Sequence, residues 1–138
     1  MMFEPLVTMA AGAVESADVV ALTLNAMFGL LCVPRRRYVL YHLFDERGVL
    51  TIDDIARHVA ARERGVPPDA VSEADHQRVV VSLVHNHLPR LAEHGIVDYD
   101  CRSGDVVLSY NADFVEPHVE SARACECPSA TEEVERRG

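Results

Sequence analysis

The segment from Ser72 to Glu93 carries polar side chains that can bind nucleic acid, spaced along one side of a helix. It has no glycine or proline before Pro89, and its apolar residues recur every three or four positions, which favours an amphipathic helix. At about 100° per residue, Val81, Val84, Leu88 and Leu91 face inward and five polar residues do not: Ser82, Asn86 and Arg90 face outward, with Arg78 and His85 at one edge. Arginine can pair with guanine and asparagine with adenine in the major groove, whereas serine and histidine can contact bases or phosphates. The pattern also fits an ordinary solvated helix face, so these residues are candidates.

Two earlier helices are predicted to support this one. Apolar residues at helical spacing predict the first over 16–31. Pro34 suits the first turn of the second, whose apolar stripe ends before Gly48.

Two capping signals define the next helices. Thr51 and Asp54 have the spacing of a capping box, which predicts a third helix that ends near Gly65. Ser72 and Asp75 repeat this spacing at the start of the polar helix. Pro89 removes a backbone donor near the far end of that helix, where we expect a kink.

After the polar helix the periodicity changes to that of strands. Residues 96–101 and 106–110 are short β-prone runs, and the intervening 102–105 contains Gly104, which can adopt the positive φ of a hairpin turn. Apolar residues at helical spacing predict a last helix over 114–122.

Three consecutive helices followed by a two-stranded hairpin form the plan of a winged helix-turn-helix. We therefore expect a mainly α fold with a small β-hairpin and additional N- and C-terminal helices. Helix 73–94 is the predicted recognition helix and hairpin 96–110 the predicted wing, whose tip residues Arg102 and Ser103 are expected near DNA phosphates.

The expected domain organisation is simple. One winged-helix domain spans 13–124, with its core over 34–110. Residues 1–12 and the charged run 125–138 are expected to be flexible.

Several segments resemble known families. Residues 33–40 (VPRRRYVL) and 50–56 (LTIDDIA) resemble helices of arsenic-repressor-like winged-helix regulators. Residues 24–110 are similar to a family of small winged-helix proteins of halophilic archaea, known only as a domain of unknown function, through three blocks: 34–40, 85–91 and 95–100. The resemblance implies a transcription regulator whose target is not established.

The charge composition agrees with such a source. The net charge is −9, and all thirteen basic residues are arginine. Acidic, lysine-free chains suit a concentrated-salt cytoplasm, although a GC-rich genome also favours arginine. Residues 34–102 hold ten arginines and eleven acids, so the centre of the chain is nearly neutral and compatible with nucleic acid.

The sequence contains no motif that indicates catalysis, cofactor binding or membrane insertion. No nucleotide-binding loop, nucleophile elbow or zinc-protease motif is present, so we expect no enzyme and no catalytic residue. No apolar run approaches the roughly 20 residues of a membrane span, and residues 1–8 lack the basic region of a secretory signal. We therefore expect a cytoplasmic protein without cofactor.

Metal binding is likewise not expected. The four cysteines lack C-x-x-C spacing, although Cys125 and Cys127 could capture a soft metal. His85 and His87 point apart on a helix, so we interpret them, with His76 and His94, as buried or interface residues.

Two features point to contacts beyond the helical trio. Arg35, Arg36 and Arg37 stand at a helix N-terminus, where positive charge needs an anion: a phosphate, or acids of the first helix or of a partner subunit, such as Glu15 and Asp18. The flanking helices carry apolar faces that we expect to form a homodimer, through Leu24, Met27, Phe28, Phe114, Val115 and Val119. Packing on their own domain is the alternative.

These observations favour a dimeric regulator that binds double-stranded DNA. The alternative is a winged-helix module for protein interaction that does not bind DNA. A neutral or basic surface over helix 73–94 and the wing would favour the first interpretation, and a uniformly acidic one the second.

Overall fold

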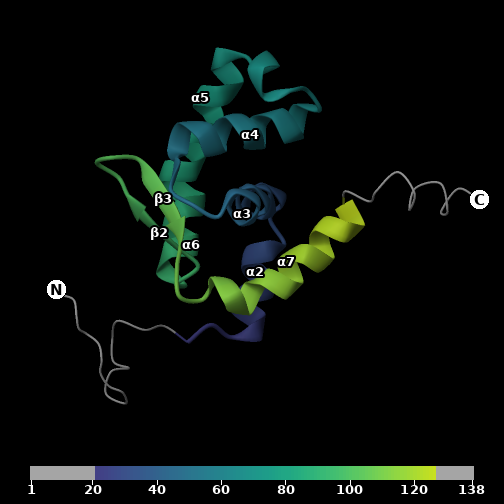
Figure 1. Ribbon diagram of the computed structural model, residues 1–138, viewed down its shortest axis with the longest axis vertical. Helices are drawn as coiled ribbons and strands as arrows, with labels where there is room; N and C mark the ends of the chain where they lie inside the picture. Colours follow the sequence, from purple (N-terminus) through teal and green to yellow (C-terminus); the bar gives the residue numbers. More distant parts are fainter. Residues whose placement is uncertain (1–20, 127–138) are drawn as a thin grey trace, which may run out of the picture.

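Five helices and a small three-stranded antiparallel sheet make up the described part of the chain, residues 21–126, in a computed structural model (Figure 1). The elements follow in this order: α2 (Leu24–Leu31), α3 (Pro34–Glu46), β1 (Leu50–Thr51), α4 (Ile52–Arg64), the 3-10 turn η1 (Pro68–Ala70), α5 (Glu73–Ser82), the π turn η2 (Leu83–His87), α6 (Leu88–Glu93), β2 (Val97–Asp100), β3 (Asp105–Leu108) and α7 (Ala112–Glu126). Because α5, η2 and α6 are continuous, they form one long helix. The predicted mainly α fold with a small sheet is confirmed, and its layout is consistent with a winged helix.

The capping residues define the two central helices as predicted. The Thr51 hydroxyl accepts a hydrogen bond from the Asp54 N–H at 3.1 Å, and Gly65 ends α4 with φ of 69°. The Ser72 hydroxyl likewise accepts from the Asp75 N–H at 3.1 Å, at the start of α5.

The first helix is shorter than the sequence predicts. In the described residues it begins at Leu24, because Thr23 has extended backbone and caps it through a hydrogen bond from the Ala26 N–H at 3.0 Å. The predicted helix over 16–31 is therefore wrong for residues 21–23, and residues 16–20 lie outside the described part.

The sheet contains one strand that the sequence did not indicate. The strand order is β1-β3-β2, with Tyr99 opposite Val106 in the hairpin and Val106 opposite Leu50 of β1. Gly104 adopts φ of 80° at the hairpin turn, as expected. Its carbonyl oxygen accepts a hydrogen bond from the Ile52 N–H at 2.8 Å, which ties the turn to the start of α4.

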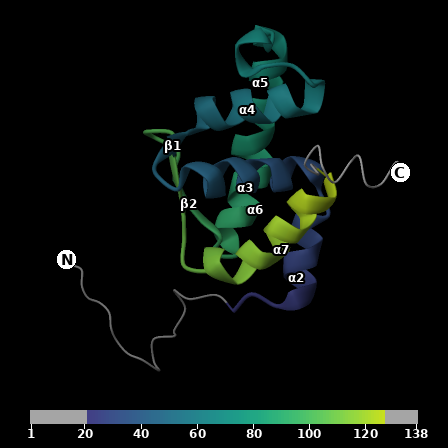
Figure 2. The same ribbon diagram turned by 45° about the vertical axis from the view of Figure 1, so that its right-hand side comes forward.

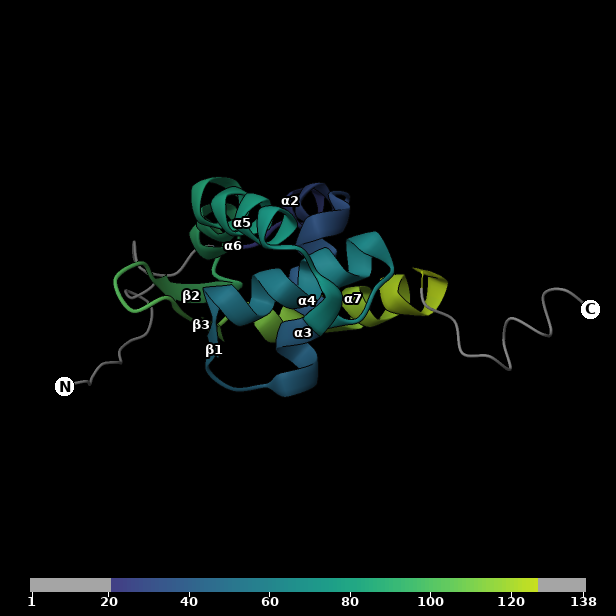
Figure 3. The same cartoon turned by 90° about the horizontal axis from the view of Figure 1, so that it is seen from above.

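Helix α3 occupies the centre of the fold. Figure 2 shows α4 on one side of it and α2 and α7 on the other. Seen from above, the sheet lies at one end of α4, and the long helix packs against one side of α4 (Figure 3). The most deeply buried side chains of α3 include Tyr41, Leu40 and Leu43. Because α2 and α7 pack against α3, they belong to the core of this chain.

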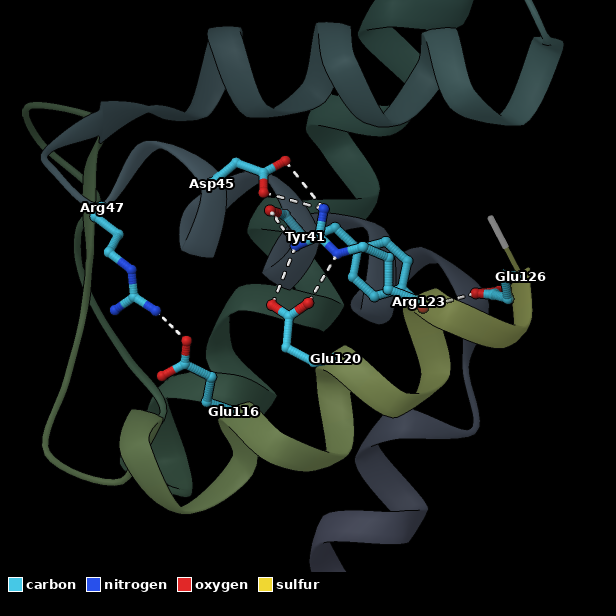
Figure 4. Close-up of polar contacts among 7 residues, drawn as sticks. All are labelled: Tyr41, Asp45, Arg47, Glu116, Glu120, Arg123 and Glu126. Atoms are coloured by element: carbon cyan, nitrogen blue, oxygen red, sulfur yellow. Dashed lines mark hydrogen bonds and ion pairs between the residues drawn. The ribbon is translucent and has the colours of Figure 1, made fainter. Parts of the chain in front are cut away.

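Charged side chains join α3 to α7 along what we call the α3–α7 seam. The Tyr41 hydroxyl donates to Glu126 at 2.8 Å, and Arg37 forms an ion pair with Glu126 at 2.7 Å. Arg123 lies 4.9 Å above the Tyr41 ring and pairs with Asp45 at 3.0 Å (Figure 4). The ion pair of Arg47 with Glu116 extends the seam, and Glu120 pairs with Arg123 within α7.

The contacts of the seam shift the pKa values of two of its residues, Glu126 and Tyr41. The hydrogen bond from Arg37 lowers the pKa of Glu126, and burial, followed by the Glu126 carboxylate, raises the pKa of Tyr41 above its ordinary range. Glu126 is therefore ionised and Tyr41 protonated at neutral pH. The end of α7 is therefore held to α3 by the Glu126 carboxylate, which accepts hydrogen bonds from Arg37 and Tyr41.

Candidate nucleic-acid interface

The exposed side of the long helix carries the polar residues predicted there. Arg78, His85, Asn86 and Arg90 are exposed, and Ser82 is half-buried. Arg78 lies on α5 and Arg90 on α6, so the polar face extends across the π turn. We call these five residues the polar face.

The core side of the same helix differs from the prediction over its first half. Val81 was expected to face inward, but it is 53% exposed and lies among the polar residues. Val84 is only partly buried, whereas Val79 and Leu83 occupy the core. Leu88 is fully buried, as predicted.

The π turn explains the difference. The Leu88 N–H donates to the carbonyl oxygen of Leu83, five residues earlier, so one extra residue enters the turn. The buried positions before the turn are consequently shifted by about one residue from those expected if a regular helix extended N-terminally from Leu88. The turn ends just before Pro89, which has no N–H and whose ring crowds the carbonyl of His85 in a regular helix. The predicted irregularity at Pro89 thus takes the form of a wider turn.

The members of the polar face differ in how free their side chains are. Arg78 lies 3.1 Å from an Asp75 carboxylate oxygen that also binds Arg64 at 2.9 Å. The bond from Arg64 is the main cause of the lowered pKa of Asp75. Within residues 21–126, the side chains of Asn86 and Arg90 make no hydrogen bond or ion pair. Asn86 and Arg90 are therefore available to a ligand, whereas Arg78 must first leave Asp75.

A buried pair lies beneath the polar face. Arg36 of α3 and His87 of the π turn are 9% and 6% exposed, and the Arg36 Nε–H donates to His87 Nδ1 at 3.1 Å. Burial, and next the charge of Arg36, lower the pKa of His87. Burial, and next the charge of Arg90, lower the pKa of Arg36. His87 is therefore neutral at pH 7 and serves as a hydrogen-bond acceptor.

Because of the Arg36–His87 hydrogen bond, we expect the protein to lose stability in mild acid. Because the pKa of folded His87 lies below its unfolded value of about 6.5, its contribution is complete above pH 6.5 and is lost as the pH falls through the folded pKa. The free energy of unfolding can be measured with urea at pH 7.5 and at pH 5, at constant KCl. Its decrease between the two pH values should be smaller for His87→Gln than for the wild type. His85→Gln, on the exposed side, should retain the wild-type decrease. Equal decreases in all three proteins would contradict this role of His87.

The other two arginines of the N-terminal cluster bind acids, but these acids lie on α4 and α7, not on the first helix or a partner subunit as the sequence predicted. Arg35 forms a two-point ion pair with Glu63 of α4, at 2.6 and 2.7 Å. Arg37 belongs to the α3–α7 seam. The acids named from the sequence, Glu15 and Asp18, lie outside the described residues.

The wing presents its predicted tip residues but also a cluster of acids. Arg102 and Ser103 are exposed between β2 and β3. The Arg102 N–H donates to an Asp100 carboxylate oxygen at 2.9 Å. Asp98, Asp100 and Asp105 are all exposed on the hairpin. The wing surface is therefore acidic around one arginine, in contrast to the polar face.

The predicted dimer residues fall into two groups. Leu24, Phe28 and Phe114 are about half-exposed and lie on α2 and α7. The other three are fully buried in the core of one chain: Met27, Val115 and Val119. Their assignment to a dimer surface is corrected, because they cover α3 and have no surface to offer a second chain.

The histidines are distributed partly as predicted. His76 and His87 are buried, whereas His85 is exposed and His94 half-buried, so His85 and His87 do not converge. A different group was not predicted from the sequence: ligand atoms of His42, Asp54 and His58 lie within 4.8 Å of one another. The only sequence signal was the spacing of Asp54 and His58, four residues apart on one helix.

Helices α3 and α4, the long helix and the β2–β3 hairpin have a layout consistent with a winged helix. The family DUF7344, a domain of unknown function, matches residues 28–107, more than half of the chain, and the chain belongs to this family. No curated protein and no solved structure gives a significant match. None of the helices within residues 21–126 is long and apolar enough to cross a membrane.

Proposed function

We propose that the chain is a DNA-binding transcription regulator that reads the major groove with the polar face. The observation that carries the proposal is the exposure of Asn86 and Arg90, four residues apart, with no described residue bound to either side chain. Their amide and guanidinium groups match the edges of adenine and guanine. The long helix follows α3 and α4 in the order of a helix-turn-helix, in which the last helix enters the groove.

The charge distribution supports DNA as the partner on this face. The chain carries −9 overall, but residues 34–102 have a net charge of −1. Arg78 and Arg90 lie on the polar face, and the buried Arg36 adds positive potential beneath Arg90. The acidic, lysine-free composition supports a halophilic archaeon as the source and a cytoplasm of concentrated salt as the working environment.

A homodimer formed through α2 and α7 is part of the proposal. Phe28 contacts His118 edge to face at 5.8 Å between ring centroids, and Phe114 lies 6.4 Å from the same ring. These rings and Leu24 form an apolar patch across two helices, although both helices also pack on their own domain. A two-fold dimer would place two recognition helices against a pseudo-palindromic site.

The double variant Phe28→Ser/Phe114→Ser is expected to be monomeric and folded, because these side chains contribute exposed area and little to the core. Light scattering after size exclusion in molar KCl measures the mass. Val49→Ser removes an exposed apolar side chain outside α2 and α7 and should leave the mass unchanged. A dimer that survives the double substitution would exclude this patch as the interface.

The second candidate function is protein recognition without DNA binding. It is favoured by the acidic wing, where Asp98, Asp100 and Asp105 are exposed on the same hairpin as Arg102, and by the exposed Val81 within the polar face. Exposed carboxylates repel phosphates, whereas a lone apolar residue within a polar rim suits a protein partner.

Selection from a pool of random DNA duplexes in molar KCl tests the proposal. We expect enrichment of one pseudo-palindromic sequence by the wild type and its loss in the double variant Asn86→Ala/Arg90→Ala. Arg62→Ala is the matched control, because it also removes one arginine, here one that lies over Tyr38 and Tyr41 of α3. Lack of any enrichment by the folded wild type would favour the protein-recognition function.

A further inference from the structure

We propose that His42, Asp54 and His58 bind a divalent transition-metal ion between α3 and α4. One nitrogen of each imidazole and one carboxylate oxygen lie within 4.8 Å of one another. His42 Nε2 is 2.9 Å from an Asp54 carboxylate oxygen, and His58 Nδ1 is 3.5 Å from the other. A tetrahedral ion with bonds of about 2.1 Å holds its ligand atoms about 3.4 Å apart, which is less than the 4.8 Å within which these three atoms already lie.

The helices hold these ligands for reasons already visible in the fold. Asp54 lies in the first turn of α4, which the Thr51 cap fixes, and His58 follows four residues later on the same side. His42 reaches them from α3, with its side chain 10% exposed. The site therefore joins two helices through one rather rigid and two more exposed ligands.

The present arrangement of the rings indicates what binding would change. The His42 and His58 rings stack with centroids 4.0 Å apart and an angle of 18°. Stacked rings have nearly parallel in-plane lone pairs, whereas a shared ion needs them to converge. The His58 side chain is 37% exposed and can turn once its Nδ1 leaves the backbone carbonyl oxygen of Asp54, 3.0 Å away, so binding should separate the stack.

The donor set and its surroundings define the class of ion. Two imidazoles and one carboxylate suit Zn²⁺, Ni²⁺, Co²⁺ or Cu²⁺, whereas Ca²⁺ and Mg²⁺ prefer all-oxygen sites. The two histidines line an open groove of about 400 Å³ together with Tyr38, Asp45 and Arg62. Three protein ligands beside an open groove leave a position for water or a small molecule, unlike a closed structural zinc site.

Metal titration of the full-length, tag-free chain tests the site independently of DNA binding. Calorimetry with Ni²⁺ or Zn²⁺ at pH 7.5 should give one ion per chain and a raised melting temperature. His58→Gln and Asp54→Asn should each weaken binding by at least about 100-fold, since even loss of a group behind a metal ligand costs 10- to 100-fold. His85→Gln leaves the same number of histidines as His58→Gln and should bind like the wild type. Binding should also weaken on acidification, because protons compete for imidazole.

Two outcomes would overturn the proposal. The first is unchanged affinity in both site variants, each shown to be folded by its melting curve. The second is a Co²⁺ spectrum with thiolate charge-transfer bands that persist in both variants, which would assign the ion to the cysteines. We expect the stacked contact between the His42 and His58 rings to be lost when the metal binds. The imidazole NMR signals of these two residues measure this change.

Discussion

A chain that ends after Tyr110 is expected to lose its cooperative fold. The truncation removes α7, whose Val115 and Val119 are fully buried, and uncovers the side of α3 on which they pack. Burial of each valine contributes about 1.5 to 3 kcal/mol, and total stability is typically about 5 to 15 kcal/mol. Tyr41, fully buried in the intact chain, also loses Glu126 as acceptor and Arg123 over its ring.

Circular dichroism and urea unfolding in molar KCl measure this effect. We expect the truncated chain to lack a cooperative transition and to aggregate. A chain that ends after Glu126 is the matched control, because it keeps α7 with its contacts to α3 and should retain a cooperative transition. A cooperative transition of unchanged midpoint in the shorter chain would show that α7 is an appendage. The experiment therefore separates a core role of α7 from a purely dimeric one.

Local signals predicted most of the fold. The caps at Thr51 and Ser72 and the glycines Gly65 and Gly104 act through neighbouring backbone atoms, so their effects can be anticipated from short sequence windows. β1, by contrast, has only two residues and exists because β3 lies beside it. A strand defined by a distant partner leaves no periodicity in its own sequence.

The sequence predicted which polar residues make up the candidate site, but not which way every neighbouring side chain faces. Helical projection identified the exposed residues of the polar face, yet it assigned Val81 to the core because a regular helix has no extra residue. Pro89 indicated an irregularity without specifying that a π turn precedes it. A single inserted residue changes the direction of all those before it, which local spacing cannot reveal.

Contacts between distant segments account for the remaining misses. Arg35 binds Glu63 and Arg37 binds Glu126, so the predicted need for acids was correct but their identity depended on how α4 and α7 pack. Met27 shows the same limitation, because an apolar face has the same pattern whether its own chain or a second one covers it.

Base-specific readout is expected to dominate DNA binding. In concentrated salt the Debye length falls to about 3 Å or less, so attraction to phosphates is screened and short-range contacts matter more. Asn86→Ala and Arg90→Ala should each cost about 1 to 3 kcal/mol on the selected site and relax preference at one base pair. Arg78→Ala should cost less than Arg90→Ala, since Arg78 must first give up its bond to Asp75.

The wing provides the contrasting case. Arg102→Ala, if it removes a phosphate contact, should weaken all sequences about equally and flatten the dependence of affinity on salt. Competition between selected and scrambled duplexes at several KCl concentrations distinguishes the two kinds of contact, with Arg62→Ala as the charge control. Because Asp98, Asp100 and Asp105 are exposed on the same hairpin as Arg102, the wing effect should be small beside that of Asn86. If all these variants bind like the wild type, the polar face does not read DNA, and its exposed Val81 becomes the centre of a protein-binding surface.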